Sequence, residues 1–350
     1  MQIFKPGDIV EGYRVMSELG RGAASVIYLV QDTKAKTIWA FKHVAREDAK
    51  DARFLDQASR EYEVASKLQH PNIRRIERMI RIKSGLLSIG ELMLVMELVD
   101  GQAVDRSPPR TFEQAADIFE QTARGLAYMH ASGWVHADMK PNNIVVDDKG
   151  HVKIIDLGQS CPMNTVKKRI QGTPDYIAPE QVHRQPITHK TDIYNLGATI
   201  YWALTRHFVP TALAKPDSLV GSIDSSLIEK PKPPSELNTR IPEIFSDLIM
   251  QCVEVEPAMR PDTMNVVAER LNLIKAKLLA EVELRKSGSF RRVRDDDEAA
   301  KSGGRGKSGS AASGRVPHPS PPPPISAAGG IDDESVDLDP DELPNPAKPN

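Results

Sequence analysis

Apolar and polar residues alternate repeatedly near the start of the chain. Three runs of this kind, YRVMSELG, SVIYLVQD and TIWAFKHV, lie between glycine and Asp-Thr turn signals in residues 8–44. A period of two places apolar side chains on one face of an extended strand, so each run predicts a strand of an antiparallel sheet. Two further apolar runs, at 73–83 and 91–98, complete a predicted five-stranded sheet.

Apolar positions at helical spacing mark five other segments. One falls between the third and fourth strands, at 51–69, and stops before Pro71, as helices commonly do ahead of proline. The others lie at 111–132, with Thr111 as the N-cap residue, and at 188–205, 243–253 and 263–284. A small antiparallel sheet with one main helix, followed by a larger and mostly helical region, is an α+β fold.

The composition is that of an ordinary folded protein. With 350 residues, 40% hydrophobic and 27% charged, the chain is expected to form one two-lobed domain with additional material, or two domains. A net charge of −2 gives no general attraction to nucleic acid or to an anionic membrane. Two cysteines, Cys161 and Cys252, cannot make a disulfide framework. The first residues resemble no secretory signal, and no apolar run approaches the roughly 20 residues that span a bilayer. We therefore expect a cytoplasmic protein without a membrane anchor.

After Arg285 the composition changes to Ser, Gly, Ala and Pro. A basic run, RRVR at 291–294, precedes an acidic run, DDDE at 295–298, and four prolines at 321–324 precede the acidic end IDDESVDLDPDELP. Little of this sequence can bury a core, so residues 286–350 are predicted to be disordered. The proline-rich or acidic segment can dock on a partner protein, although a solvated spacer is the commoner use of such a tail.

The candidate chemistry is concentrated in WVHADMKPNNIVVDDKGHVKIIDLG, residues 134–158. Asp138, Lys140 and Asn143 fall on a loop, and Asp156 follows a short predicted hairpin. A carboxylate can accept a hydroxyl proton, and a lysine can neutralise a migrating phosphoryl group. An amide and a second carboxylate are hard oxygen ligands for Mg²⁺. Each residue alone is more often part of a polar hairpin, but their joint spacing suits phosphoryl transfer.

A glycine-rich turn and a strand lysine add to this set. LGRGAASVI, residues 19–27, joins the first two predicted strands, and few side chains there keep backbone N–H groups away from phosphate oxygens. Lys42 lies on the third strand. Both features are common on protein surfaces, so they indicate a phosphate-binding site only in combination with the loop at 138–143.

The segment His136–Asn143 resembles the catalytic loop of eukaryotic-type (Hanks-type) Ser/Thr protein kinases, and Asp156-Leu157-Gly158 resembles their magnesium loop. The resemblance covers roughly residues 10–275 and departs from the family pattern at Ala137, where most members have Arg, and at Leu157, where many have Phe. It implies a bilobal kinase fold. After an N-terminal extension at 1–12, the kinase domain would occupy 13–285, with an N-lobe at about 13–98 and a C-lobe at about 102–285.

The resemblance implies a role for each residue of the transfer site. Asp138 would be the base, Lys140 would stabilise the transferred charge, and Thr173 would contact both. Asn143 and Asp156 would hold Mg²⁺, with Mn²⁺ as an alternative ion.

A second set would bind ATP. Lys42 would hold the α- and β-phosphates and would pair with Glu61, for which Glu63 is the competing candidate. The glycine-rich loop, the inter-lobe hinge and the apolar positions around the adenine would supply the rest: Leu19, Gly20, Gly22, Ser25, Ile27, Ala40, Met96, Glu97, Val99 and Val145.

Further matches lie beyond the magnesium loop. Ala178-Pro179-Glu180 matches the family's Ala-Pro-Glu, and Arg260 would pair with Glu180 in a buried ion pair. Asp192 would hold the backbone of the catalytic loop. Gly172-Thr173 has the form typical of hydroxyl-specific kinases rather than tyrosine-specific ones.

The implied function is ATP-dependent phosphorylation of Ser and Thr hydroxyls on protein substrates, autophosphorylation included, in signalling. A pseudokinase scaffold is one alternative, but a scaffold has no physical need of the complete set of catalytic residues. A small-molecule phosphotransferase is another. Lys140, Arg260 and the Ala-Pro-Glu element favour a protein substrate.

Overall fold

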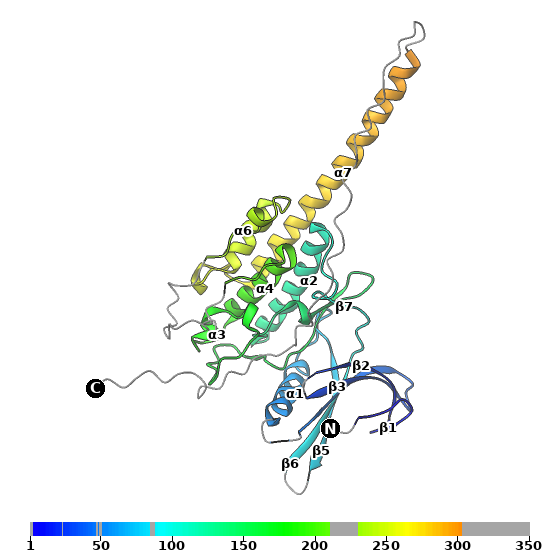
Figure 1. The fold of residues 1–350 in the computed structure, drawn as a ribbon, viewed down its shortest axis with the longest axis vertical. Coiled ribbons are helices and arrows are strands. Elements are labelled where there is room, and N and C mark those ends of the chain that lie inside the picture. The colour runs from blue at the N-terminus through cyan, green and yellow to red at the C-terminus, as the bar shows by residue number, and fades with distance from the viewer. Residues whose placement is uncertain are drawn as a thin grey trace, which may run out of the picture. The chain divides into compact units, whose positions relative to one another are not determined.

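The computed structural model describes residues 3–22, 24–46, 48, 51–84, 88–210 and 230–302. Residues up to Ala276 belong to one compact unit, and a second unit begins at Lys277. Figure 1 shows that the first unit contains an N-terminal antiparallel sheet and a helical C-terminal part. This is the bilobal α+β fold that the sequence predicts.

The N-terminal sheet has six strands in the order β1-β2-β3-β4-β6-β5. Every neighbouring pair is antiparallel. The strands are β1 (Ile9–Val10), β2 (Tyr13–Arg21), β3 (Ser25–Asp32), β4 (Ile38–Ala45), β5 (Ile76–Ser84) and β6 (Ser88–Met96). The sequence predicts only five of these strands. It does not predict β1, because two residues are too few to show an alternation of apolar and polar positions.

The described residues before Tyr13 pack against the sheet of this lobe. Phe4 is buried in the core cluster of the sheet, and its backbone N–H donates to the hydroxyl of Tyr28 over 3.2 Å. Ile9 pairs with Arg14 across the β1–β2 ladder. A buried aromatic ring stabilises a fold by roughly 1.5–3 kcal/mol, so the described residues of the segment predicted as an extension at 1–12 pack on this sheet.

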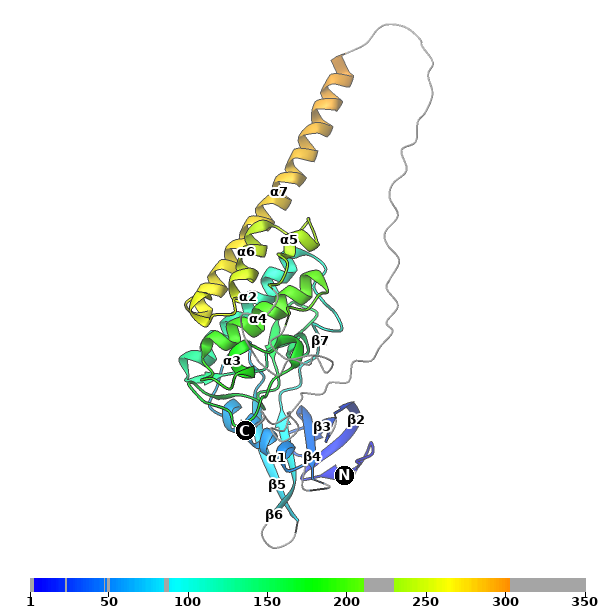
Figure 2. The same ribbon diagram turned by 60° about the vertical axis from the view of Figure 1, so that its left-hand side comes forward.

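One helix, α1 (Ala52–Ala65), lies beside this sheet in both Figure 1 and Figure 2. Its inward face is the apolar stripe of the predicted helix, with Leu55, Ala58, Val64 and Ala65 buried. The same face carries one buried acid, Glu61. The helix therefore positions a carboxylate against the strands.

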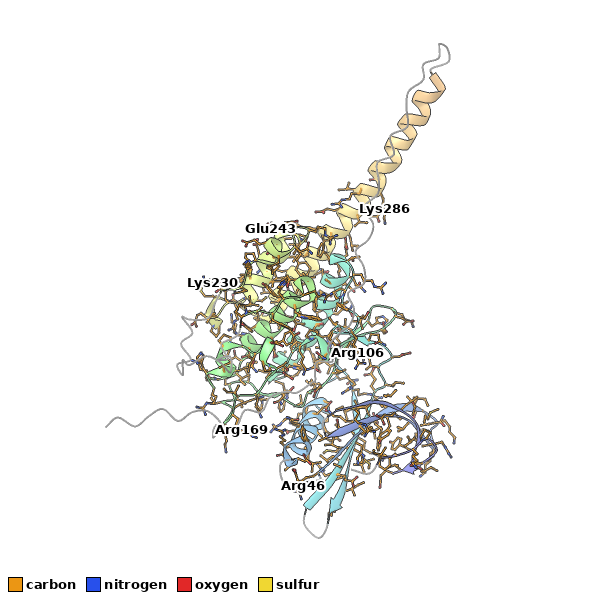
Figure 3. All side chains as sticks on the ribbon, viewed as in Figure 1. Arg46, Arg106, Arg169, Lys230, Glu243 and Lys286 are labelled. Atoms are coloured by element: carbon orange, nitrogen blue, oxygen red, sulfur yellow. The ribbon has the colours of Figure 1, made fainter. Side chains whose placement is uncertain are left out.

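The C-lobe is built from packed helices. These are α2 (Phe112–Ala131), α3 (Pro179–Val182), α4 (His189–Thr205), α5 (Pro234–Leu237), α6 (Glu243–Cys252) and the start of α7 (Met264–Ser302). Thr111 caps α2 as predicted, since its side chain accepts the N–H of Gln114 at 3.1 Å. Most of α4 is buried, which accounts for the high apolar content of the sequence after its first turns. In Figure 3, Glu243 marks the start of α6 and Arg46 the end of β4.

Short strands flank the catalytic loop and the magnesium loop in the C-lobe. β7 (Gln102–Ala103), β9 (Ile144–Val146) and β10 (Val152–Ile154) form one small sheet in the order β10-β9-β7. β8 (Trp134–Val135) pairs with β11 (Cys161–Pro162). The hairpin predicted between the two candidate acids is thus the β9–β10 pair.

Helix α7 continues to Ser302, past residue 286, where the sequence predicts the tail to start. This part of the chain contains many helix-forming residues, and Lys286 contacts Glu283 at 3.0 Å within the helix. Composition that cannot bury a core can still continue a helix that has already begun. The predicted tail from 303 onward, with its prolines and acidic end, lies outside the described residues.

Within the described ranges no helix has both the length and the apolar content needed to cross a bilayer.

Candidate active site

Strand β4 and helix α1 bring Lys42 to Glu61. The Lys42 ammonium donates to Glu61 Oε2 at 2.8 Å, and Glu61 is only 1% exposed. The other oxygen of Glu61 accepts a bond from the guanidinium of Arg74 at 2.9 Å. Glu63, the competing candidate, instead lies on the exposed face of α1 and contacts Lys67 at 3.3 Å. Glu63 is exposed because Glu61 faces the sheet, and helix positions two residues apart do not lie on the same face.

The charges of Lys42 and Asp156 stabilise each other. Burial disfavours the charged lysine, but Glu61 and Asp156 outweigh it and raise the pKa of Lys42 above its ordinary value. Burial likewise disfavours the Asp156 carboxylate, but Lys42 and the Gly158 N–H hold its pKa below the ordinary value. At neutral pH the site therefore holds a cation and an anion.

The backbone of the catalytic loop is held by Asp192 from α4. Its two carboxylate oxygens accept the N–H groups of His136 at 2.9 Å and Ala137 at 2.8 Å, together with the His130 side chain at 2.8 Å. Ala137 has φ of +62°, a left-handed conformation that costs energy for a residue with a side chain. The buried carboxylate therefore stabilises the strained bend that precedes Asp138.

Asp138 is the centre of a polar cluster. Its Oδ1 accepts both the backbone N–H of Thr173 at 2.9 Å and the Thr173 hydroxyl at 2.8 Å. Its Oδ2 lies 3.9 Å from the Lys140 ammonium. The amide nitrogen of Asn143 donates to the Asp138 carbonyl at 2.8 Å. Burial raises the pKa of Asp138, and Lys140 offsets part of that rise. The structure thus brings together the four predicted residues of the transfer loop and the activation segment.

Asp156 is held at a turn. Its φ is +60°, and its Oδ1 accepts the N–H of Gly158 at 3.2 Å. The adjacent Ile155 N–H donates to the Asn143 carbonyl at 3.0 Å, which ties the end of the hairpin to the catalytic loop. The two predicted metal-ligating residues, Asp156 and Asn143, are therefore connected through one backbone bond.

The residues predicted to bind nucleotide line neighbouring strands. Ladder registers pair Ile27 with Lys42 and Ala40 with Met96, so strand pairing connects the phosphate-binding lysine to the hinge. Gly20 is the penultimate residue of β2, and the turn closes where the Gly22 N–H donates to the Ser25 carbonyl at 2.8 Å. The other members are the exposed Leu19, the hinge residues Glu97 and Val99, and the buried Val145.

The activation segment, residues 156–180, ends in a buried ion pair. Arg260 donates to the two oxygens of Glu180 at 2.7 and 2.9 Å, in the bidentate geometry that the sequence predicts. It also donates to the carbonyls of Glu254, Lys190 and Val255. The guanidinium side chain is 0% exposed, so the pair anchors the segment within the C-lobe.

Two residues at the site carry no signal that the sequence analysis used. Arg74 reaches Glu61 from a loop that is distant along the chain, and no local pattern indicates such a contact. Gln181 directly follows the Ala-Pro-Glu element and is only 3% exposed. The sequence does not indicate this burial, because a helix of four residues is too short to show a buried face.

Comparison with known proteins agrees with this geometry. The family model described as "Protein kinase domain" matches residues 13–271. A probable serine/threonine-protein kinase of Clostridium acetobutylicum is 28% identical over 292 residues, covering 81% of this chain and 42% of that protein. Serine/threonine-protein kinase pkn3 of Myxococcus xanthus is 28% identical, covering 75% of this chain and 50% of its own. PknA of Mycobacterium tuberculosis is also 28% identical, with coverages of 75% and 61%. The chain thus spans between about two fifths and three fifths of the length of these relatives.

Proposed function

The chain belongs to the protein kinase family, and on that premise we propose that it is an ATP-dependent serine/threonine protein kinase. One observation carries the proposal. The Lys42–Glu61 pair and the Asp138–Thr173 pair occur in one compact unit together with Asp156. Catalysis of phosphoryl transfer needs these groups as positioned charges and acceptors. The printed names of the relatives support Ser and Thr as the acceptor residues.

Lys42 and the hinge are proposed to hold ATP. Lys42 would contact the α- and β-phosphates, and Glu61 with Arg74 fixes the direction of its approach. At the hinge, the Glu97 N–H already donates to the Arg75 carbonyl at 2.8 Å, so its carbonyl is the group that can accept from adenine. Val99 would supply the second backbone contact. The adenine ring would lie between apolar side chains, namely those of Ile27, Ala40, Met96 and Val145.

The residues at the magnesium loop fit a divalent cation. The pKa of Asp156 stays below its ordinary value despite burial, so a hard anionic oxygen is present at neutral pH. The amide nitrogen of Asn143 is used in its bond to the Asp138 carbonyl, which orients the amide group and leaves the oxygen as its ligand atom. When bound, Mg²⁺, or Mn²⁺ as the alternative ion, would neutralise charge on the phosphates.

Asp138 is proposed to take the proton of the acceptor hydroxyl. Thr173 occupies Oδ1 with two bonds, so Oδ2, on the side of Lys140, is the oxygen that can accept it. Burial raises the pKa of this carboxyl, which strengthens it as a base relative to an exposed Asp. Lys140, beside Asp138, would neutralise the charge on the phosphoryl group during its transfer.

Three functions can be separated by one assay. A protein kinase transfers phosphate to a generic mixture of proteins, and a small-molecule phosphotransferase transfers it to members of a small-alcohol panel. A pseudokinase scaffold does neither. ATP turnover measured with both acceptor sets, and with mass spectrometry of the protein products, tests the proposal. Phosphate on the alcohols alone, or no turnover with either set, would overturn it.

Replacing Asp156 by Ala is expected to weaken Mg²⁺-dependent nucleotide binding by more than about tenfold, since a charged contact contributes roughly 1.5–3 kcal/mol. Calorimetric titration with ATP, with and without Mg²⁺, measures the effect. Asp148→Ala removes an exposed carboxylate of the neighbouring hairpin and is the matched control. Equal Mg-ATP affinity in the Asp156 variant and the parent would refute the metal assignment.

Activity is expected to depend only weakly on phosphorylation of the activation segment. A phosphate there acts by pairing with a cation next to the catalytic acid, and that position is Ala137. Ser160 is 3% exposed, so Thr165 is the more accessible hydroxyl. We expect Thr165→Ala and the phosphatase-treated parent to keep turnover within about tenfold of the untreated enzyme, a difference of about 1.4 kcal/mol. A larger fall in either preparation would show that a phosphate receptor exists elsewhere.

A further inference from the structure

Gln181 is a buried amide that joins the catalytic loop, the activation segment and helix α4. Its Nε2 donates to the carbonyl of Ala137 at 2.8 Å and to the carbonyl of Gln171 at 3.1 Å. Its Oε1 accepts the backbone N–H of Ala178 and the side-chain amide of Asn195, each at 3.0 Å. All the donors and acceptors of one amide group are therefore used.

The direction of this amide is fixed by its surroundings. Two donors face Oε1, from Ala178 and Asn195, and two carbonyl oxygens face Nε2. A flipped amide would place oxygen against both carbonyls and nitrogen against both donors. Asn195 is oriented in turn, because its amide nitrogen also donates to the Tyr176 carbonyl at 2.7 Å. Gln181 therefore acts as a donor toward the catalytic loop and the activation segment.

These two carbonyls lie next to the catalytic contact. Ala137 directly precedes Asp138, and Gln171 lies two residues before Thr173. The Asp138–Thr173 pair joins the same two segments through bonds of 2.8 and 2.9 Å. Gln181 is thus a second connection between the two segments, parallel to the one that fixes the catalytic carboxylate.

Gly172 shows how closely the amide fits. It lies between Gln171 and Thr173 with φ of +138°, and a Cβ added there would be 3.2 Å from Gln181 Nε2. The backbone of the activation segment at Gly172 therefore lies close to the Gln181 amide. A side chain at residue 172 would press on Gln181 and on Ile177.

The earlier part of the activation segment is held by backbone bonds. Cys161 pairs with Val135 in the β8–β11 ladder, and the Met163 N–H donates to the Gly133 carbonyl at 2.9 Å. The Ile187 N–H donates to the Thr165 carbonyl at 2.8 Å. None of these three contacts involves a charged group, and the Lys167 ammonium adds a bond within the segment, to the Gln159 carbonyl at 2.8 Å.

We propose that Gln181 is a positioning residue that sets the geometry of the Asp138–Thr173 pair, in place of a cation and a phosphate on the activation segment. The proposal rests on the kinase function proposed above. Its Nε2 fixes the distance between the two segments, and the Thr173 hydroxyl and N–H then orient the carboxylate toward the acceptor. The hydrogen bonds of the Gln181 side chain are with Ala137, Gln171, Ala178 and Asn195 and none is with Lys42 or Asp156, so nucleotide affinity is expected to change little without it.

A double-mutant cycle tests this role. Gln181→Leu, which removes the amide at similar volume, is expected to lower kcat on a protein substrate about 10–100-fold, the size of effect that a misplaced catalytic group produces. The KM for ATP is expected to stay within about twofold of the parent. The Thr173→Ala background removes the hydroxyl bond to Asp138 and keeps the backbone N–H bond, so the same change is expected to cause a clearly smaller loss there than in the parent, because Gln181 acts partly through that hydroxyl. Equal losses in both backgrounds would show a purely structural role and overturn the proposal.

Controls separate the failures of the two proposals. Rates are divided by the concentration of Mg-ATP binding sites from titration, so partial unfolding is not counted as lost turnover. Where Gln181→Leu leaves too few sites, Gln181→Met, an unbranched chain of similar length, takes its place in the cycle. Gln185→Glu, on an exposed side chain just beyond this helix, is expected to match the parent. An inactive parent contradicts the kinase function, whereas an active parent with unchanged kcat in both Gln181 variants contradicts only this inference.

Discussion

Replacing Asp138 by Asn is expected to lower turnover by roughly 10²–10⁴-fold, the usual contribution of a positioned general base. The asparagine oxygen can still accept both bonds from Thr173, so the activation segment should keep its place. It cannot accept the proton of the acceptor hydroxyl. Because the base acts on the acceptor and not on ATP, nucleotide affinity should change little.

The measurement for Asp138→Asn is steady-state kinetics with a protein substrate, alongside calorimetric titration with Mg-ATP. Asp148→Asn makes the same change on an exposed carboxylate of the following hairpin and is expected to match the parent. Burial raises the pKa of Asp138, so the parent should lose activity toward acid at a higher pH than an exposed Asp would give. Matched turnover in the Asp138 variant and the parent would remove Asp138 from its role as base.

Replacing Arg260 by Met is expected to lower the free energy of unfolding by about 3–5 kcal/mol, the usual cost of leaving one partner of a buried ion pair without the other. Glu180 would remain charged at 4% exposure, and among the described residues the Thr191 hydroxyl, at 2.8 Å, would be its remaining side-chain donor. Three backbone carbonyls would also lose their donor. The expected change in melting temperature is about 6–20 °C, given roughly 2–4 °C per kcal/mol for a domain of this size.

Thermal and urea unfolding measure the Arg260→Met effect. Arg285→Met is the matched control, because that arginine lies 3.9 Å from Glu281 with 83% of its side chain exposed. Exposed pairs of this kind contribute only about 0–1 kcal/mol. Adding Glu180→Leu to Arg260→Met should recover part of the loss, since it removes the stranded charge but not the unpaired carbonyls. A fall in the control as large as that in Arg260→Met would contradict the argument from burial.

Local sequence determined most of the elements that carry the site. The alternation in residues 13–45 and the helical spacing in 51–69 predict β2, β3, β4 and α1 to within a few residues, because side chains on a buried face must be apolar at a fixed period. The spacing of Asp138, Lys140 and Asn143 likewise places three groups on one loop, since neighbours along the chain cannot lie far apart in space.

Where local signals were weak, the secondary structure differs from what the sequence predicts. Strand β1 has two residues, too few to show a period, and it forms because Phe4 and β2 hold the chain beside the sheet. Helix α7 extends past residue 286 although the composition there cannot bury a core, because helical hydrogen bonds are local and the helix had already started.

Contacts between distant segments were decided by tertiary structure alone. The sequence offered Glu61 and Glu63 as partners for Lys42 and could rank them only by register, whereas the orientation of α1 on the sheet buries one and exposes the other. Arg74 completes the Glu61 cluster from a loop, and Gln181 joins segments that are 44 and 10 residues away from it. Such bonds depend on which surfaces the fold brings together. The sequence alone therefore determined which residue types form the site. The tertiary structure decided which partners they contact, because it buries side chains from distant segments together, and this burial sets their charge states and the geometry of the catalytic carboxylate.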